Sequence, residues 1–294
     1  MSEKLFIRIK SFRCNQGKGK ARYFEQDIFP YPTVKPSQNR KKKSAATFAD
    51  MDAKKLKAYE THKNAQQDLN DARAVRYCRL LVETNFNLGD IRIHPTYADE
   101  FLPDSFEDAQ RVMANYIRKL KRMAKKKGKE LKYVYVTELG SVHGRLHHHL
   151  LVNASSGLTR EELEEAWPYG YCSTDIIRDI EEAAGYLTKS KRNYKGKHIY
   201  SASRNLVKPT VTTADRKMSQ KKLRQLTEAS NEQIKEYFEE QNPDYKLVGI
   251  YRYVPVEEEL EEEQCKLWRD GFSYLRVYMR LKDQTKKKRR CTRC

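Results

Sequence analysis

The sequence has few of the features that mark several common classes of protein. Its 294 residues contain no apolar run of the roughly 18 to 20 residues needed to cross a bilayer, and the first ten residues lack the apolar stretch of a signal peptide. A Gly-x-x-x-x-Gly-Lys-Ser/Thr loop for ATP is missing, and no unit of about 20 to 50 residues repeats. We therefore expect a cytoplasmic protein with no membrane partner, no solenoid architecture and no ATP-driven motor.

Cysteine is also scarce, with six residues scattered along the chain. In a cytoplasmic chain of this length, such a pattern favours reduced thiols over a disulfide framework. The terminal pair Cys291 and Cys294 could supply two zinc ligands, but no second close pair accompanies it. Two reduced thiols in a frayed tail are therefore the favoured interpretation.

Positive charge is abundant. Lys and Arg number 59 against 40 Asp and Glu, which gives a net charge of +19 and an isoelectric point near 9.5. Basic residues occur along the whole chain, a distribution that suits a polyanionic partner such as nucleic acid. Charge alone is equally compatible with a ribosome-like or chromatin-like coating protein.

Composition and periodicity predict three parts. Residues 1–47 are rich in Lys, Arg, Tyr and Pro without sustained periodicity, which predicts a poorly packed basic arm. Residues 48–209 carry the patterns of a mixed domain, and residues 210–294 predict a charged, helical and strand-containing extension with a basic tail. Helices are expected at about 48–85, 105–128, 159–167, 179–189 and 209–241, and strands at about 91–94, 131–137, 145–152, 246–254 and 272–281.

The strand at 145–152 contains the first candidate for chemistry. His147 and His149 are two residues apart, so their side chains point to one face, about 6 to 7 Å apart along the strand. Antiparallel pairing with the strand at 131–137 can bring Glu138 beside them. Two imidazoles and a carboxylate can hold a divalent ion that keeps open positions for a phosphate oxygen. The alternative is that the histidine run is a polar cluster or a structural network.

The helix expected after Asp179 contains the second candidate. Glu182, Tyr186 and Lys189 follow the spacing i, i+4, i+7 beside an apolar face. A phenol with its ordinary pKa of about 10 is a weak nucleophile at neutral pH, and a nearby ammonium or metal ion lowers that pKa. Tyr186 is thus a candidate covalent nucleophile, although on this motif alone, in a chain with 19 tyrosines, a tyrosine that packs at a helix edge is the favoured interpretation.

The order of these features, a carboxylate strand, a His-x-His strand and then a Tyr-x-x-Lys helix, resembles that of HUH endonucleases. The matching segments read GRLHHHLL at residues 144–151 and GYLTK at residues 185–189. Within that family the chain looks like the rolling-circle replication initiators (Rep) of plasmids and bacteriophages, close to the gene-II-like group of filamentous phages. The resemblance runs from about Arg76 to Pro209. It implies an α+β fold with an antiparallel sheet flanked by helices, of the ferredoxin-like or RRM-like class.

The resemblance also implies an activity. His147, His149 and Glu138 would hold Mn²⁺ or Mg²⁺, and Tyr186 would attack single-stranded origin DNA in the cytoplasm of a bacterial host. The products would be a 5′-phosphotyrosine link and a free 3′-OH, which a host polymerase extends after a host helicase has separated the strands. Lys189 would neutralise charge at the reacting phosphate. We expect further DNA contacts from basic residues near the site, namely Arg145, Lys191, Arg192, Arg204 and Lys208.

Three departures from the family pattern qualify these expectations. The middle position of the histidine motif is His148 rather than an apolar residue, which leaves the strand register open, and the role of His94 in the preceding strand is open too. Only one tyrosine occupies the tyrosine motif, so a two-tyrosine relay is not supported. The alternatives are a transposase or mobilisation protein of the same active-site class, and a non-catalytic basic nucleic-acid-binding protein.

Overall fold

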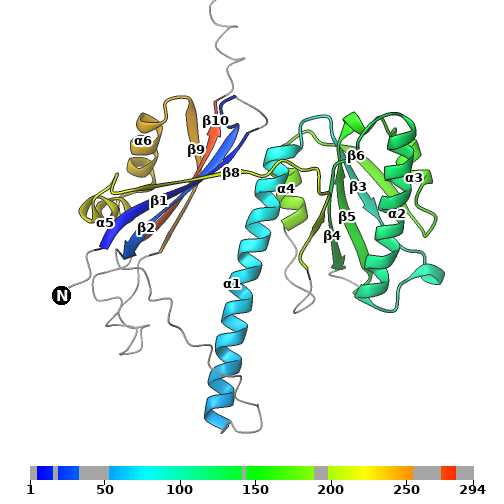
Figure 1. Ribbon diagram of the computed structural model, residues 1–294, viewed down its shortest axis with the longest axis horizontal. Helices are drawn as coiled ribbons and strands as arrows, with labels where there is room; N and C mark the ends of the chain where they lie inside the picture. Colours follow the sequence, from blue (N-terminus) through cyan, green and yellow to red (C-terminus); the bar gives the residue numbers. More distant parts are fainter. Residues whose placement is uncertain are drawn as a thin grey trace, which may run out of the picture. The chain divides into compact units, whose positions relative to one another are not determined.

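The computed structural model describes residues 5–15, 19–32, 53–140, 144–188, 198–253 and 273–282. The chain divides into two compact units (Figure 1). The central unit is Ser44–Lys208, and the split unit combines Met1–Lys43 with Pro209–Cys294. Among the helices that the structure describes, none combines the length and apolarity required to cross a bilayer.

The central unit is built on a five-stranded antiparallel sheet with the strand order β6-β3-β5-β4-β7. Its strands are β3 (Ile91–Pro95), β4 (Tyr133–Leu139), β5 (Leu146–Val152), β6 (Cys172–Ile176) and β7 (Ser201–Ala202). Its helices are α1 (Ala53–Asn85), α2 (Phe106–Lys126), α3 (Arg160–Glu165) and α4 (Ile180–Thr188), with single 3-10 turns at η2 (Asp99–Phe101) and η3 (Ala154–Ser156).

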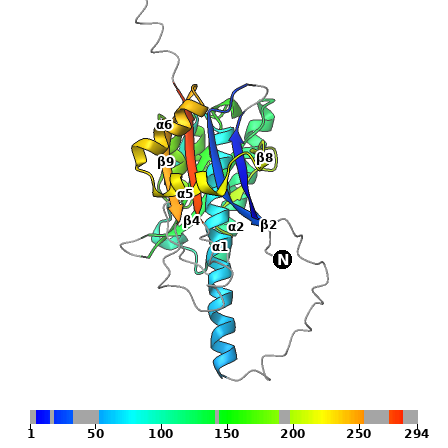
Figure 2. The same cartoon turned by 90° about the vertical axis from the view of Figure 1, so that its left-hand side faces the viewer.

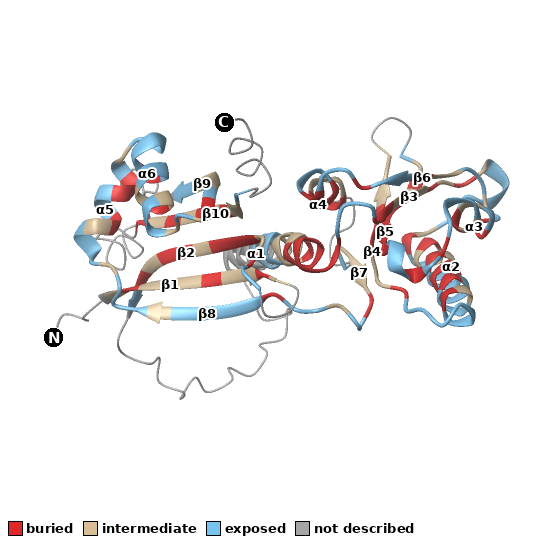
Figure 3. Cartoon of the chain, turned by 90° about the horizontal axis from the view of Figure 1, so that it is seen from above, coloured by how far each residue is buried: buried red, intermediate tan, exposed pale blue. Residues whose placement is uncertain are grey.

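Strand alternation sends the apolar side chains of this sheet into two cores. Ile93 and Leu150 pack with α2 on one face, whereas Leu151 packs with α1 and α4 on the other. Figure 1 shows α2 and α4 on opposite sides of the sheet, and Figure 3 shows the buried stripe along α2. Ser105 caps α2, its side chain accepting a hydrogen bond from the Asp108 amide at 3.1 Å.

The split unit contains a second five-stranded antiparallel sheet, with the order β8-β1-β2-β10-β9. Its strands are β1 (Leu5–Cys14), β2 (Tyr23–Pro32), β8 (Thr210–Asp215), β9 (Tyr245–Tyr253) and β10 (Tyr274–Leu281). Helices α5 (Gln220–Glu228) and α6 (Asn231–Gln241) pack on one face of it (Figure 2). The core between them includes Ile7, Phe24, Ile234 and Leu275.

The structure confirms the α+β class and its antiparallel sheet flanked by helices. The predicted hairpin is present as β4 and β5, joined in the register Glu138 opposite His147. The expected strands near 246–254 and 272–281 are β9 and β10. Asp179 begins α4 as predicted, its side chain accepting hydrogen bonds from the Glu181 amide at 2.7 Å and the Glu182 amide at 3.3 Å.

The prediction for the N-terminal end of the chain is wrong. Residues 1–47 were expected to form a poorly packed arm, yet β1 and β2 lie in this region and bury Ile7, Phe24 and Ile28. The reason is long-range pairing, because β2 lies between β1 and β10, which is some 240 residues further along the chain. The helical stretch expected directly after Pro209 is also wrong at its start, where β8 pairs with β1 instead. The basic stretches 40–43 and 286–290 and the terminal cysteines lie outside the described residues.

Candidate metal and nucleophile site

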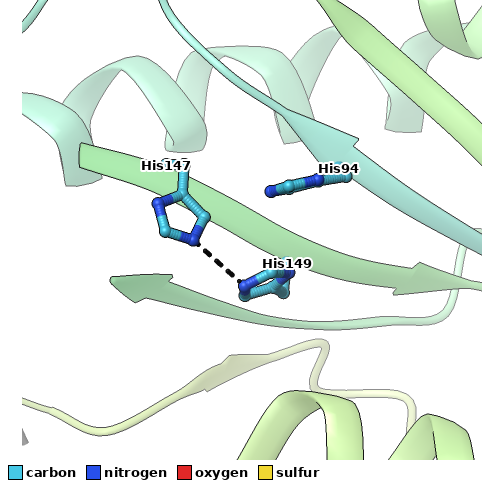
Figure 4. Close-up of side chains that lie close together, drawn as sticks. All are labelled: His94, His147 and His149. Carbon is cyan, nitrogen blue, oxygen red and sulfur yellow. Dashed lines mark hydrogen bonds between the residues drawn. The ribbon is translucent and has the colours of Figure 1, made fainter. Parts of the chain in front are cut away.

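Three histidines from two adjacent strands meet on the face of the sheet that α4 covers. His147 and His149 share this face because they are two residues apart on β5. His94 ends up beside them because β3 pairs with β5 in the register that sets Ile93 opposite Leu150 and Thr96 opposite His147. Figure 4 shows the three rings directed into one space above the sheet.

The donor nitrogens of this cluster lie close enough to share one ion. One ligand atom from each of His94, His147 and His149 lies within 4.8 Å of the others. Nε2 of His147 and Nε2 of His149 are 3.2 Å apart, near the separation of about 3 Å for two nitrogens that bind one ion at about 2 Å. The His94 ring stacks on the His149 ring, with centroids 4.7 Å apart and an interplanar angle of 17°. The three histidines could therefore hold a metal ion.

The hydrogen bonding and the pKa values of these imidazoles are compatible with metal binding. Nε2 of His94 and Nδ1 of His149 are buried without a hydrogen-bond partner in the described part of the chain. Burial, together with the neighbouring His149 and His147, lowers the pKa of His94 to about 4. Burial also lowers the pKa of His147. Neutral imidazoles are the form that ligates a metal, so the donor set and its buried free nitrogens suit a divalent ion.

Glu138 lies at the edge of the same cluster, as the hairpin predicted. Its Oε2 atom is 3.5 Å from Nε2 of His149 and 4.0 Å from Nε2 of His147. The sequence indicated Glu138 as the third ligand, whereas the structure brings a third imidazole, His94, to the two predicted histidines. Glu138 is therefore placed either to bind an ion itself or to orient His149 toward one.

His148, whose role the sequence left open, points to the opposite face of β5. Its ring is buried, with Nε2 2.6 Å from the Tyr97 hydroxyl and Nδ1 2.8 Å from the Thr137 hydroxyl. Burial lowers the pKa of His148 to about 3, so the ring is neutral and joins the two hydroxyls as one donor and one acceptor. His148 thus fixes β5 against β4, which keeps both flanking histidines on the α4 face.

Tyr186 projects from α4 onto the histidine cluster. Its ring centroid is 4.1 Å from that of His149 and 6.4 Å from that of His94. On the same helix Ile180, Ala184 and Leu187 are buried, so Tyr186 sits at the border of the apolar face, as predicted. Burial raises the pKa of Tyr186 to about 12, while the charge of Arg92 opposes that shift and Glu138 adds to it.

Arg92 is a site residue that sequence reasoning missed. It lies two residues before His94 and therefore on the same face of β3. Its guanidinium carbon is 4.8 Å from the Tyr186 ring centroid, and its nitrogens pair with Asp175 at 3.0 Å and Glu182 at 3.2 Å. The alternation of β3 was visible in the sequence, but only the pairing of β3 with β5 shows that this face belongs to the site.

The residues that were predicted to contact DNA lie in different environments. Arg145 is held by the loop before η2, because its guanidinium pairs with Asp99 and donates to the Tyr97 carbonyl at 2.8 Å. Arg204 and Lys208 are exposed on the segment between β7 and β8. Lys189, Lys191 and Arg192 lie outside the described residues.

Comparison with known proteins gives one match. Residues 95–193 match a family of replication-associated proteins, named for the ORF2 protein and the gene II protein. That span contains Glu138, His147, His149 and Tyr186 and begins one residue after His94. Neither a curated protein nor a solved structure shows significant similarity to the chain. The family match supports a Rep-like replication initiator and a role in DNA replication.

Proposed function

We propose that the protein nicks and rejoins single-stranded origin DNA by covalent attack of Tyr186, as an initiator of rolling-circle replication. The observation that carries this proposal is the contact of Tyr186 with the histidine cluster, with its ring 4.1 Å from that of His149. A tyrosine that merely packed at a helix edge would have no reason to meet three convergent imidazoles, two of which have a buried nitrogen without a hydrogen-bond partner in the described part of the chain. The match to a replication-associated family supports DNA as the substrate.

The proposed reaction is an in-line transfer at phosphorus. The Tyr186 hydroxyl gives up its proton as its oxygen forms a bond to the scissile phosphorus, the bond from phosphorus to the 3′-oxygen breaks, and that oxygen takes up a proton and leaves as a 3′-OH. The result is a 5′-phosphotyrosine link, and attack by a 3′-OH on this link reverses the step and rejoins the strand. A divalent ion, Mn²⁺ or Mg²⁺, would supply charge stabilisation at the phosphate and at the attacking oxygen.

Each of the site residues has a role in the proposed reaction. His94, His147 and His149 would hold the ion, with Glu138 as a further ligand or as the partner that orients His149. Arg92 supports the face of the Tyr186 ring, so that the phenol keeps one orientation before DNA arrives. Lys189, three residues after Tyr186, is proposed to neutralise charge on the reacting phosphate. A host polymerase and a host helicase complete the proposed replication system.

The test uses purified wild-type protein and Tyr186→Phe with labelled single-stranded DNA from the protein's own genetic element, in Mn²⁺ or in chelator. Tyr171→Phe is the matched control, because Tyr171 is 73% exposed and lies in the same unit. We expect a protein-linked DNA band on a denaturing gel that requires both metal and Tyr186. DNA binding without an adduct for any metal or substrate would contradict the proposal and favour a non-catalytic binding protein.

A further inference from the structure

We propose that the split unit carries a binding surface for single-stranded DNA, made of five aromatic rings at one end of its sheet. The rings come from four adjacent strands and lie on the face opposite α5 and α6. They are Tyr251 on β9, Tyr274 on β10, Phe29 and Tyr31 on β2, and Phe6 on β1. This set is called the aromatic ladder below.

The ladder is continuous across the sheet. Ring centroids are 6.0 Å apart from Tyr251 to Tyr274, 6.4 Å from Tyr274 to Phe29, 6.5 Å from Phe29 to Tyr31 and 5.7 Å from Tyr31 to Phe6. Residues that are paired directly across two strands lie on the same face of a sheet, so Phe6 shares a face with its partner Tyr31. The paired residues Leu275 and Ile28 lie in the core, so their neighbours Tyr274 and Phe29 lie on the opposite face, the face of the ladder. Three of these steps cross from one strand to the next, and the step from Phe29 to Tyr31 runs along β2.

Exposure separates the ladder from the core. Tyr251 is 52% exposed and Tyr31 is 36% exposed, whereas Phe24 in the core under the helices is fully buried. On the ladder face, Tyr23 and Glu25 are fully buried, whereas Tyr31 and Tyr251, the two most exposed rings of the ladder, lie at the end of the sheet where β1 begins and β2 ends. Rings that served only to stabilise cross-strand packing would gain most from burial.

Cations are interleaved with the rings. The Arg8 guanidinium lies 3.6 Å above the Tyr31 ring centroid, held there by two hydrogen bonds to Asp215 at 2.7 and 2.8 Å. Arg276 is fixed beside Tyr274 by its 2.7 Å bond to Asp27. The five strands of this sheet carry seven Lys and Arg against three Asp and Glu.

A third arginine is placed by an unusual backbone conformation. Arg216 has φ of 64°, in the left-handed region that residues other than glycine seldom adopt. This conformation directly follows β8 and sets its guanidinium 5.6 Å from the Phe6 ring centroid. Arg8 on β1 and Arg216 after β8 thus bring two cations to the Phe6 ring, and Arg8 also reaches the neighbouring Tyr31 ring.

Half-exposed rings with arginines between them match the chemistry of a single nucleic-acid strand. Unpaired bases stack on aromatic faces, and the backbone phosphates meet the cations, whereas a duplex keeps its bases inside. The choice of DNA over RNA rests on the match to a replication-associated family. The surface is independent of Tyr186 and would hold the strand whether or not that strand is cut.

The test measures binding of fluorescein-labelled dT20 to full-length Tyr186→Phe protein in chelator, so that cleavage plays no part. Tyr31 and Tyr251 are changed together, either to Ala or to Phe. Tyr237→Ala is the matched control, because Tyr237 lies in the same unit with Lys222 4.4 Å over its ring, but on the helical side. Circular dichroism confirms that each variant is folded.

We expect the double alanine variant to bind dT20 on the order of 10-fold or more weakly, the double phenylalanine variant to bind as tightly as its parent, and the control to be unchanged. Ultraviolet cross-linking of an oligonucleotide containing 5-iodouracil should label peptides from β1, β2, β9 or β10. Unchanged affinity of the alanine variant, or equal loss in the phenylalanine variant, would overturn the proposal.

Two further binding measurements identify the type of nucleic acid that the ladder binds. A 20-base-pair duplex should compete poorly, because its bases cannot reach the rings, and equal competition that depends on the same tyrosines would overturn the assignment to single strands. Tighter binding of U20 than of dT20 would replace DNA by RNA. If an adduct never forms on wild-type protein but dT20 binding still depends on Tyr31 and Tyr251, the nicking proposal fails and the ladder stands.

Discussion

The two sheets of this protein have the same number of strands and use them differently. The central sheet buries apolar side chains on both faces and places His94, His147 and His149 on the face covered by α4. The split sheet packs its core under α5 and α6 and keeps the rings of the aromatic ladder partly exposed on the other face. Burial lowers the pKa of His94 and His147, which favours the neutral imidazoles that can bind a metal, whereas exposure leaves ring faces open to bases.

The largest effect should come from a mutation in the central sheet that removes adduct formation but leaves DNA binding nearly unchanged. His149→Ala should reduce metal-dependent adduct formation by at least about 100-fold, because it removes a donor nitrogen and the ring on which Tyr186 packs. Binding of dT20 in chelator should change less than about twofold. His198→Ala is the control, since His198 is an exposed histidine of the same unit. A matching loss of dT20 affinity in His149→Ala would show that the two sheets do not act separately.

A second comparison decides between the two candidate third ligands. His94→Ala should weaken binding of Mn²⁺ by more than about 100-fold, and Glu138→Gln by about 10-fold, as expected for a ligand and for a group that orients one. Isothermal titration of the two variants and the wild-type protein measures both values. The reverse ranking would make Glu138 the ligand and His94 the supporting ring.

The sequence predicted those contacts that form between residues close to each other along the chain. The hairpin and its alternation placed Glu138, His147 and His149 together, because that relation spans a single turn. The contact of Tyr186 with His149 depends on the packing of α4 against β5, and only the order of the motifs in the resembling family indicated it. His94 was missed as a member because its position depends on the pairing of β3 with β5, about 55 residues later, and no local pattern specifies which strands become neighbours.

The split sheet was missed for the same reason on a larger scale. Strand β1 alternates Ile7 and Ile9 with Arg8 and Lys10, which is the period of a half-buried strand. The basic and proline-rich composition of the residues around β1 nevertheless favoured the prediction of a poorly packed arm over that of a strand. The partners that bury the strands of this end include β8 and β10, which lie about 200 residues or more away in sequence, so composition alone indicated an arm.

Arg92 provides a smaller test within the central sheet. Arg92→Gln should slow adduct formation by about 3- to 30-fold, which corresponds to losing the cation that supports the Tyr186 ring. Arg92→Lys should recover part of the rate, and KM for DNA should change less than kcat. Arg111→Gln is the control, because Arg111 is an exposed arginine of α2 that pairs with Asp108 on the same helix. Equal rates for Arg92→Gln and wild type would show that the ring is oriented without the cation.

The smallest expected effects test whether the two units unfold separately, and each unit supplies a matched site. Thr159 begins α3 in the central unit and Ser230 begins α6 in the split unit, both with reciprocal capping bonds. Replacing either residue by Ala should destabilise its own unit by about 1 kcal/mol.

Hydrogen exchange measured by mass spectrometry reports on both units in one experiment. Thr159→Ala should speed exchange in peptides of α3 and leave α6 unchanged, and Ser230→Ala should do the opposite. Each effect should be roughly fivefold in rate, the equivalent of about 1 kcal/mol. Faster exchange in both units from either single change would mean that they unfold as one cooperative body, in which case a mutation in the ladder could reach the histidine cluster through stability alone.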